Sequence, residues 1–139
     1  MEDEMENTRI AVELLSVAKS IMAGSGFTIV KPLALKAEVG GTKVSLENAK
    51  RIMEAGYGLD SAVLDFDSNK ADFHTIAKFS RGREVATWEF TGFSIGYGGE
   101  GPRGLIEFAA MFGLSLDRDK VLTYGVFPEK VYLNIHQLK

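Results

Sequence analysis

Apolar positions near the start of the chain recur with the period of a helix. From Thr8 to Ala23 they are three or four residues apart, which is the spacing of one helical face. This stripe consists of Ile10, Leu14, Val17 and Ile21. A second, narrower stripe predicts a helix that Ser45 opens and that runs to Ala55, because a serine can accept from the backbone donors of a first helical turn. Gly24 can take the left-handed conformation that ends the first helix, and Gly56 is expected to end the second.

Alternating apolar and polar residues predict strands in the rest of the chain. The candidates are Leu33–Val39, Ala62–Asp67, Phe73–Phe79, Glu84–Gly98 and Val131–His136. Turns too short for a crossover helix, "SNKAD" and "SRGRE", join the three central candidates, so we expect an antiparallel meander. Within the longest candidate the large side chains change parity at Gly92, which predicts a bulge or sharp bend there.

A third helix is predicted at Gly104–Phe112, which is apolar almost all round and carries Glu107 as its only charge. The pieces after it, as far as Lys130, are expected to be short extended or looping segments. The fold class is therefore α+β: an antiparallel meander sheet of about four to six strands with two or three helices packed on one face. With neither linker nor repeat, the chain is expected to form a single domain, residues 1–139, with 1–7 as a flexible arm.

Composition and charge limit the classes of partner that we expect for this domain. The formal net charge is −3, which gives no general attraction to nucleic acid or anionic lipid. There is no cysteine, so disulfides, thiolate metal sites and cysteine nucleophiles are excluded. No apolar run reaches the roughly 18 residues of a membrane span, and the acidic start does not resemble a secretory signal. We expect a cytoplasmic protein with no nucleic-acid or membrane partner.

The glycine-rich stretch "GYGGEGPRGL", residues 96–105, is the most unusual feature of the sequence. It satisfies the dinucleotide-binding pattern G-x-G-x-x-G, and Asp117 and Asp119 lie close to the offset of a ribose-binding acid. Three features oppose that interpretation. The preceding strand alternates and follows a hairpin, Glu100 would repel a pyrophosphate, and Pro102 removes an amide from the helix start. A P-loop is disfavoured because Pro102 and Arg103 replace its lysine and hydroxyl residue.

A structural role explains most of this stretch. Pro102 would occupy the first helical position, Glu100 would complement the helix dipole near the N-cap, and the glycines would let the strand feed a buried helix at close range. The rival hypothesis is a ligand or partner loop, in which Arg103 offers a donor fork to an anion and Tyr97 a stacking face. Its candidate binding residues are Tyr97, Gly98, Gly99, Glu100, Gly101 and Arg103.

Other candidate constellations are weaker. An EF-hand-like spacing lacks the required glycine and glutamate, so no metal is expected; it comprises Asp65, Asp67, Asn69 and Asp72. His74 and His136 are expected at surface or edge positions of strands, without the acids of a metal site. Arg81 and Arg83 flank Gly82 at a hairpin tip, where a solvated turn is favoured and a partner contact is the alternative.

No nucleophile, base and oxyanion site assemble in the sequence, so no catalytic residue is assigned and no cofactor is expected. We expect a non-catalytic interaction or accessory protein that binds a protein partner or a second copy of itself, with Trp88, Arg81 and Arg83 on the partner surface. The alternative is a small binding protein or enzyme for an anionic ligand, a phosphate or nucleotide, at residues 96–104. In that case Glu100 or Glu89 would serve as acid or base.

Overall fold

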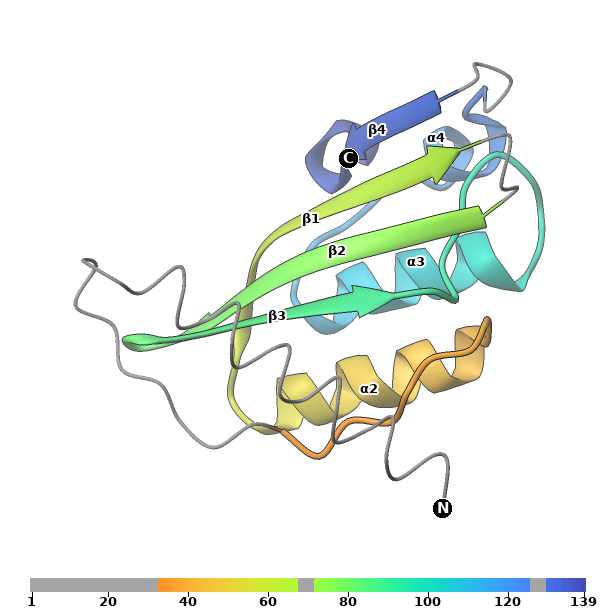
Figure 1. The fold of residues 1–139 in the computed structure, drawn as a ribbon. Helices are drawn as coiled ribbons and strands as arrows, with labels where there is room; N and C mark the ends of the chain where they lie inside the picture. The colour runs from red at the N-terminus through yellow and green to blue at the C-terminus, as the bar shows by residue number, and fades with distance from the viewer. Residues whose placement is uncertain (1–32, 68–71, 126–129) are drawn as a thin grey trace.

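A four-stranded antiparallel sheet forms the centre of the protein in the computed structural model, which describes residues 33–67, 72–125 and 130–139 (Figure 1). The strands are β1 (Gly58–Asp67), β2 (Asp72–Arg81), β3 (Glu84–Phe90) and β4 (Lys130–Asn134). Their spatial order is β3-β2-β1-β4. The first three strands form the predicted meander, and Gly82 at the β2–β3 turn has a positive φ of 60°.

Three α-helices and a 3₁₀-helix complete the described part of the fold. They are α2 (Thr42–Glu54), α3 (Glu100–Met111), α4 (Arg118–Thr123) and η1 (Ile135–Leu138). In Figure 1, α3 lies behind β2 and β3 and α2 lies beside it. The predicted helix Thr8–Ala23 and the arm 1–7 lie outside the described residues.

Helices and sheet share one hydrophobic core. Alternate residues of the strands point into it, so that Leu64, Phe79 and Phe90 are buried while Asp65, Lys78 and Glu89 lie on the other face. The helices contribute Ile52, Leu105 and Phe108, among others, to the same cluster. The α+β fold class, the number of strands and the antiparallel meander are thus as predicted.

The predicted strand Leu33–Val39 is wrong, although the segment alternates as a strand does. None of its residues joins the sheet. Its backbone bonds instead to side chains of α2: the Lys36 N–H donates to Asn48 Oδ1 (3.0 Å), and the Lys36 carbonyl accepts from Asn48 Nδ2 (2.8 Å). The Ala34 carbonyl accepts from Arg51 (2.7 Å). These side chains satisfy the backbone groups that a neighbouring strand would otherwise bond.

The long predicted strand Glu84–Gly98 ends at Phe90 instead of continuing. A bend at Thr91 and Gly92 replaces a bulge, in agreement with the predicted position of the irregularity. A Cβ at Gly92 would overlap the backbone of Gly41 and Thr42, so the absence of a side chain lets two loops pass in contact. Phe93 and Ile95 remain buried in the core, but Tyr97 is 53% exposed and does not join them.

Local capping explains the remaining differences at element ends. α2 begins at Thr42, three residues before Ser45, because the extended Gly41 serves as its N-cap. The final strand stops at Asn134, whose side chain accepts from the backbone N–H of His136 (3.0 Å) and so turns the chain into η1. His136 is therefore not in a strand.

The segment after the third helix holds α4, where only extended or looping pieces are expected from the sequence. Its N-cap is Asp117, whose side chain accepts from the Lys120 N–H (3.1 Å). Across the described ranges, no helix combines the length and the apolar character needed to cross a membrane.

Candidate functional site

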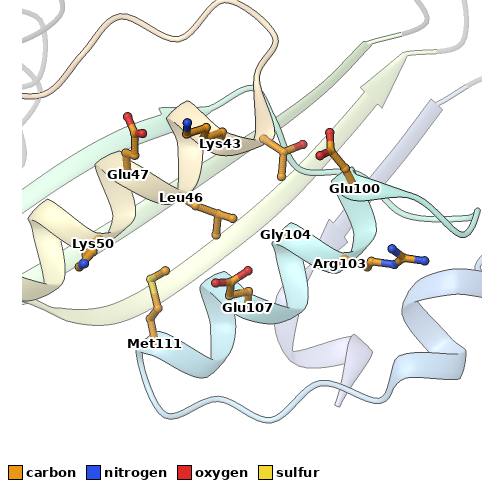
Figure 2. A pocket seen from close by; sticks show the side chains of 10 residues that line it. Lys43, Leu46, Glu47, Lys50, Glu100, Arg103, Gly104, Glu107 and Met111 are labelled. Carbon is orange, nitrogen blue, oxygen red and sulfur yellow. The ribbon is translucent and has the colours of Figure 1, made fainter.

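A groove of about 450 Å³ lies between α2 and α3 (Figure 2). It is lined by Thr42, Lys43, Leu46, Glu47, Lys50, Glu100, Arg103, Gly104, Glu107 and Met111. Both helices run from the end marked by Lys43 and Glu100 to the end marked by Lys50 and Met111 in Figure 2. Residues about sixty positions apart in the sequence thus form the two walls of one surface groove.

Gly104 sets how closely the two helices approach. A Cβ at this position would overlap Cγ2 of Thr42 and lie 3.3 Å from the Phe93 ring. The missing side chain therefore lets the first turn of α2 pack against α3. Farther along the groove the helices carry Leu46 and Met111, which are half-buried and give the groove an apolar strip.

Basic and acidic side chains in equal number border that strip. Both helices carry a basic residue followed four positions later by an acidic one: Lys43 and Glu47 on α2, Arg103 and Glu107 on α3. Among ion pairs between described residues, Glu47 is 4.0 Å from Lys36, and none involves Lys43, Arg103 or Glu107. The groove therefore offers charges that could pair with another molecule.

A second group of polar side chains surrounds one carboxylate, where α2 meets segment 33–41 and the end of β3. The half-buried Glu38 side chain accepts from four donors: the Ser45 hydroxyl, the Asn48 amide (3.1 Å), the Trp88 indole N–H and the Thr91 backbone N–H (3.0 Å). Ser45 and Asn48 are fully buried and Trp88 is 3% exposed. We call Glu38 and these four donors the Glu38 cluster.

The Glu38 cluster continues into the bend at Gly92. The Ser45 hydroxyl also accepts from the Gly92 N–H (2.9 Å), and the Thr42 hydroxyl donates to the Gly92 carbonyl (2.7 Å). All acceptor and donor groups named here are satisfied within the protein. The cluster is therefore a structural joint between α2 and β3 rather than an open reactive site.

The predicted loop residues do not form an anion cradle. A Cβ at Gly99 would lie 2.6 Å from the Tyr97 ring, and one at Gly101 would overlap the Ser94 hydroxyl. The chain's own side chains thus occupy the space beside these glycines. The Ser94 hydroxyl donates to the Tyr97 oxygen (2.9 Å), and Gly98 has open space around it. This packing favours the structural interpretation of the glycine run.

Glu100 and Arg103 are the loop residues that reach the groove, and both are exposed. Glu100 is the first residue of α3, where its negative charge complements the helix dipole as expected. Pro102 is the third residue of that helix, because α3 begins earlier than predicted. Its missing N–H is among those that a first turn leaves without an intrahelical acceptor.

The expected partner surface around Trp88, Arg81 and Arg83 is not assembled. Trp88 is buried, which corrects its expected place on a surface. Arg81 binds within the protein: it pairs with Glu84, donates to the Ala55 carbonyl and lies 4.7 Å from the centre of the Tyr57 ring. Arg83 is exposed at the hairpin tip.

Burial raises the pKa of Tyr57 above its ordinary value of 10.0. The positive charge of Arg81 opposes that shift, and the charge and hydrogen bond of Glu84 add to it. The Tyr57 residue is 5% exposed, so its side chain belongs to the hydrophobic core.

His74 lies on the outer face of the sheet between two carboxylates. Its Nε2 is 3.1 Å from Asp72, and its Nδ1 is 2.6 Å from Glu89. Glu89 follows Trp88 in β3, so it lies on the opposite face of the sheet and is exposed. His136 lies in η1, away from this group. Within the described residues, no three histidine, aspartate or glutamate side chains are grouped to hold a metal ion.

Sequence reasoning did not find the groove or the Glu38 cluster. One signal was available: Ser45 and Asn48 share the buried stripe of α2 with Ala49 and Ile52, and buried polar residues require partners. Nothing in the sequence named Glu38 as that partner. No known family model, curated protein or solved structure matches this chain.

Proposed function

We propose that this protein is a non-catalytic interaction protein and that its working surface is the α2–α3 groove. The observation that carries the proposal is the combination found there: an apolar strip at Leu46 and Met111, bordered by exposed charges of both signs. An apolar centre with a polar rim is the usual anatomy of a protein–protein contact. The expectation of a cytoplasmic location stays a prediction.

A catalytic role has less support. The best-held carboxylate, Glu38, already accepts four hydrogen bonds, so it lacks a free face for a substrate proton. Glu89 contacts His74 on the outer face of the sheet and is exposed. Glu38 is thus saturated by donors of the protein itself, and Glu89 lacks the enclosed setting in which a general acid or base usually works.

The alternative, an anionic ligand at residues 96–104, rests on Arg103 and the first turn of α3. Tyr97 and Ser94 fill the space beside Gly99 and Gly101, which weakens that alternative because backbone amides must be open to cradle a phosphate. A thermal-shift comparison with inorganic phosphate and nucleotides tests it directly. Stabilisation that Arg103→Ala abolishes would favour the ligand site over the proposed interaction surface.

Photochemical crosslinking tests the interaction surface itself. A benzophenone amino acid replaces Met111, in the groove, or Ile76, on the outer sheet face, in the full chain within the cells that make it. Both side chains are partly exposed, so the fold should tolerate the bulky replacement about equally at the two positions. We expect a covalent polypeptide adduct at position 111 and little at position 76. Adducts only at position 76, or none at all, would contradict the proposal.

A further inference from the structure

We infer that the occupant of the α2–α3 groove is the same groove of a second copy of this chain, turned by a two-fold rotation. This inference rests on the proposed function, because it names the partner of that surface. Three features of the groove support it: the order of charges along the two helices, their common direction, and the apolar side chain between the charges.

The order of charges is the same on both walls of the groove. Lys43 precedes Glu47 by four residues on α2, and Arg103 precedes Glu107 by four residues on α3. Figure 2 shows the two helices running in the same direction, with each basic residue nearer the end where the helices begin. Each wall thus has a positive and a negative position one helical turn apart.

A two-fold axis perpendicular to both helices reverses the direction of each wall. When the axis passes midway between the charged positions, Lys43 meets Glu47 of the second copy and Glu47 meets Lys43 of the second copy. The same rotation also reverses α3, so the positions of Arg103 and Glu107 on the two copies run in opposite order. Two attractive contacts on α2 arise from one symmetry operation, and the charges on α3 follow the same polarity.

The centre of the groove is suited to the same arrangement. Leu46 lies between Lys43 and Glu47 along α2, so the axis brings it close to its own copy. The half-buried Leu46 side chain would lose its remaining contact with water there, as in an interface whose apolar centre is bordered by charges. Three basic and three acidic residues line the groove, which does not favour a strongly charged partner of either sign.

Lys43 supplies an independent reason to look beyond the stability of the single chain. It is the second residue of α2, whose first turn contains no acidic residue. A positive charge at a helix start opposes the helix dipole. This lysine therefore does not stabilise the start of α2. It can, however, form an ion pair with a carboxylate of a second copy.

Charge reversal across the predicted contacts tests the inference. The full-length chain should have the mass of a dimer in light scattering at micromolar concentrations and above. Lys43→Glu puts two negative charges on its wall and Glu47→Lys puts two positive charges there. Each single variant should dissociate because like charges then face each other, with the dimer dissociation constant raised about tenfold or more. Circular dichroism and thermal unfolding verify that each variant folds.

Mixing the two single variants provides the decisive measurement. Lys43→Glu and Glu47→Lys chains, each monomeric alone, should combine into a mixed dimer because every contact then joins opposite charges. The double variant carrying both changes should dimerise by itself. Arg103→Glu and Glu107→Arg form a second pair that should behave in the same way. An effect within one chain cannot produce a mixed dimer.

The failure of this inference can be told apart from failure of the proposed function. A monomeric wild-type chain, a dimer that single reversals leave intact, or a mixture that stays monomeric would each overturn self-association through the groove. A photochemical adduct at position 111 with a polypeptide of another mass would then still support an interaction surface. An adduct only at position 76, or at neither position, would overturn both proposals.

Discussion

The indole N–H of Trp88, in β3, donates to the carboxylate of Glu38, fifty residues earlier in the chain. The same carboxylate accepts from α2 through Ser45 and Asn48. One side chain therefore joins segment 33–41, a helix and the end of a strand. We conclude that hydrogen bonds to side chains hold this segment against the core in place of strand pairing.

Removing the Glu38 carboxylate should destabilise the protein. In Glu38→Ala, the Trp88 indole and the donors of Ser45 and Asn48 would lose their acceptor in a buried setting. An unsatisfied buried donor costs about 1–3 kcal/mol, so we expect a loss of about 2–4 kcal/mol in the free energy of unfolding. Urea denaturation followed by the fluorescence of Trp88, the single tryptophan of the chain, measures the loss.

Glu54→Ala is the matched control, since Glu54 is exposed and its partner is the exposed Lys50 at 3.9 Å. A surface pair of this kind contributes about 0.3–0.5 kcal/mol, and we expect a change of that size. Equal losses in the two variants would show that the Glu38 cluster does not hold segment 33–41 in place.

Gly92→Ala should lower the free energy of unfolding more than the addition of one methyl group usually does. The added methyl group would overlap the Gly41 carbonyl and the Thr42 backbone, so one of two loops must move. That movement would also disturb the hydrogen bonds that Gly92 makes with Ser45 and Thr42. Overpacking typically costs about 1–3 kcal/mol, and we expect the upper part of that range in chemical denaturation.

The comparison variant is Gly98→Ala. A Cβ at Gly98 meets nothing within 4 Å, so the free energy of unfolding should change by less than about 0.5 kcal/mol. If Gly98→Ala proved as costly as Gly92→Ala, local backbone conformation rather than loop contact would explain both results.

The two arginines at the β2–β3 hairpin should differ in their effect on stability. Arg81→Ala removes a pair with Glu84, a hydrogen bond to the Ala55 carbonyl and a contact with the Tyr57 ring. Because the side chain is partly exposed, we expect a loss of about 1–2 kcal/mol. Thermal unfolding of Arg83→Ala, whose residue is exposed, should match the wild type. A larger effect of Arg83→Ala would reverse our assignment of roles.

The sheet could be predicted from the sequence because its pattern is local. Ala62–Asp67 and Phe73–Phe79 alternate along strands with one buried face, and Gly82 permits the tight turn between β2 and β3. The same rule predicted a strand at Leu33–Val39. Alternation indicates only that one side of a segment is buried, and it does not identify what the backbone bonds to. Whether strand backbone or helix side chains satisfy its hydrogen bonds depends on residues far along the chain.

The candidate site could not be predicted for a related reason. The groove requires Gly104 to contact Thr42, a relationship between segments that only the packed fold brings together. Arg103 and Glu100 were singled out for their neighbouring glycines, yet they reach the groove because α3 begins at Glu100. The period of the aromatic residues likewise extended β3 to Gly98, because buried loop residues such as Phe93 and Ile95 continue the apolar pattern of the strand.

Stability should fall at alkaline pH because of Tyr57. Its phenol is neutral when protonated, and burial raises its pKa in the folded state above 10.0. Between the unfolded and the folded pKa, the folded protein keeps a proton that the unfolded chain has lost. The stabilisation is therefore complete below about pH 10 and declines as the pH rises through the folded pKa. Urea denaturation from about pH 8 to about pH 11 measures this decline.

Tyr57→Phe separates this effect from the titration of lysines and the other tyrosines, which occurs in both proteins. The phenylalanine cannot lose a proton, so the variant should have a shallower decline in the free energy of unfolding above about pH 10. The difference between the two curves is the contribution of Tyr57. Parallel curves would mean that the phenol ionises equally easily in the folded and unfolded chains, and that its burial beside Arg81 and Glu84 does not disfavour the phenolate.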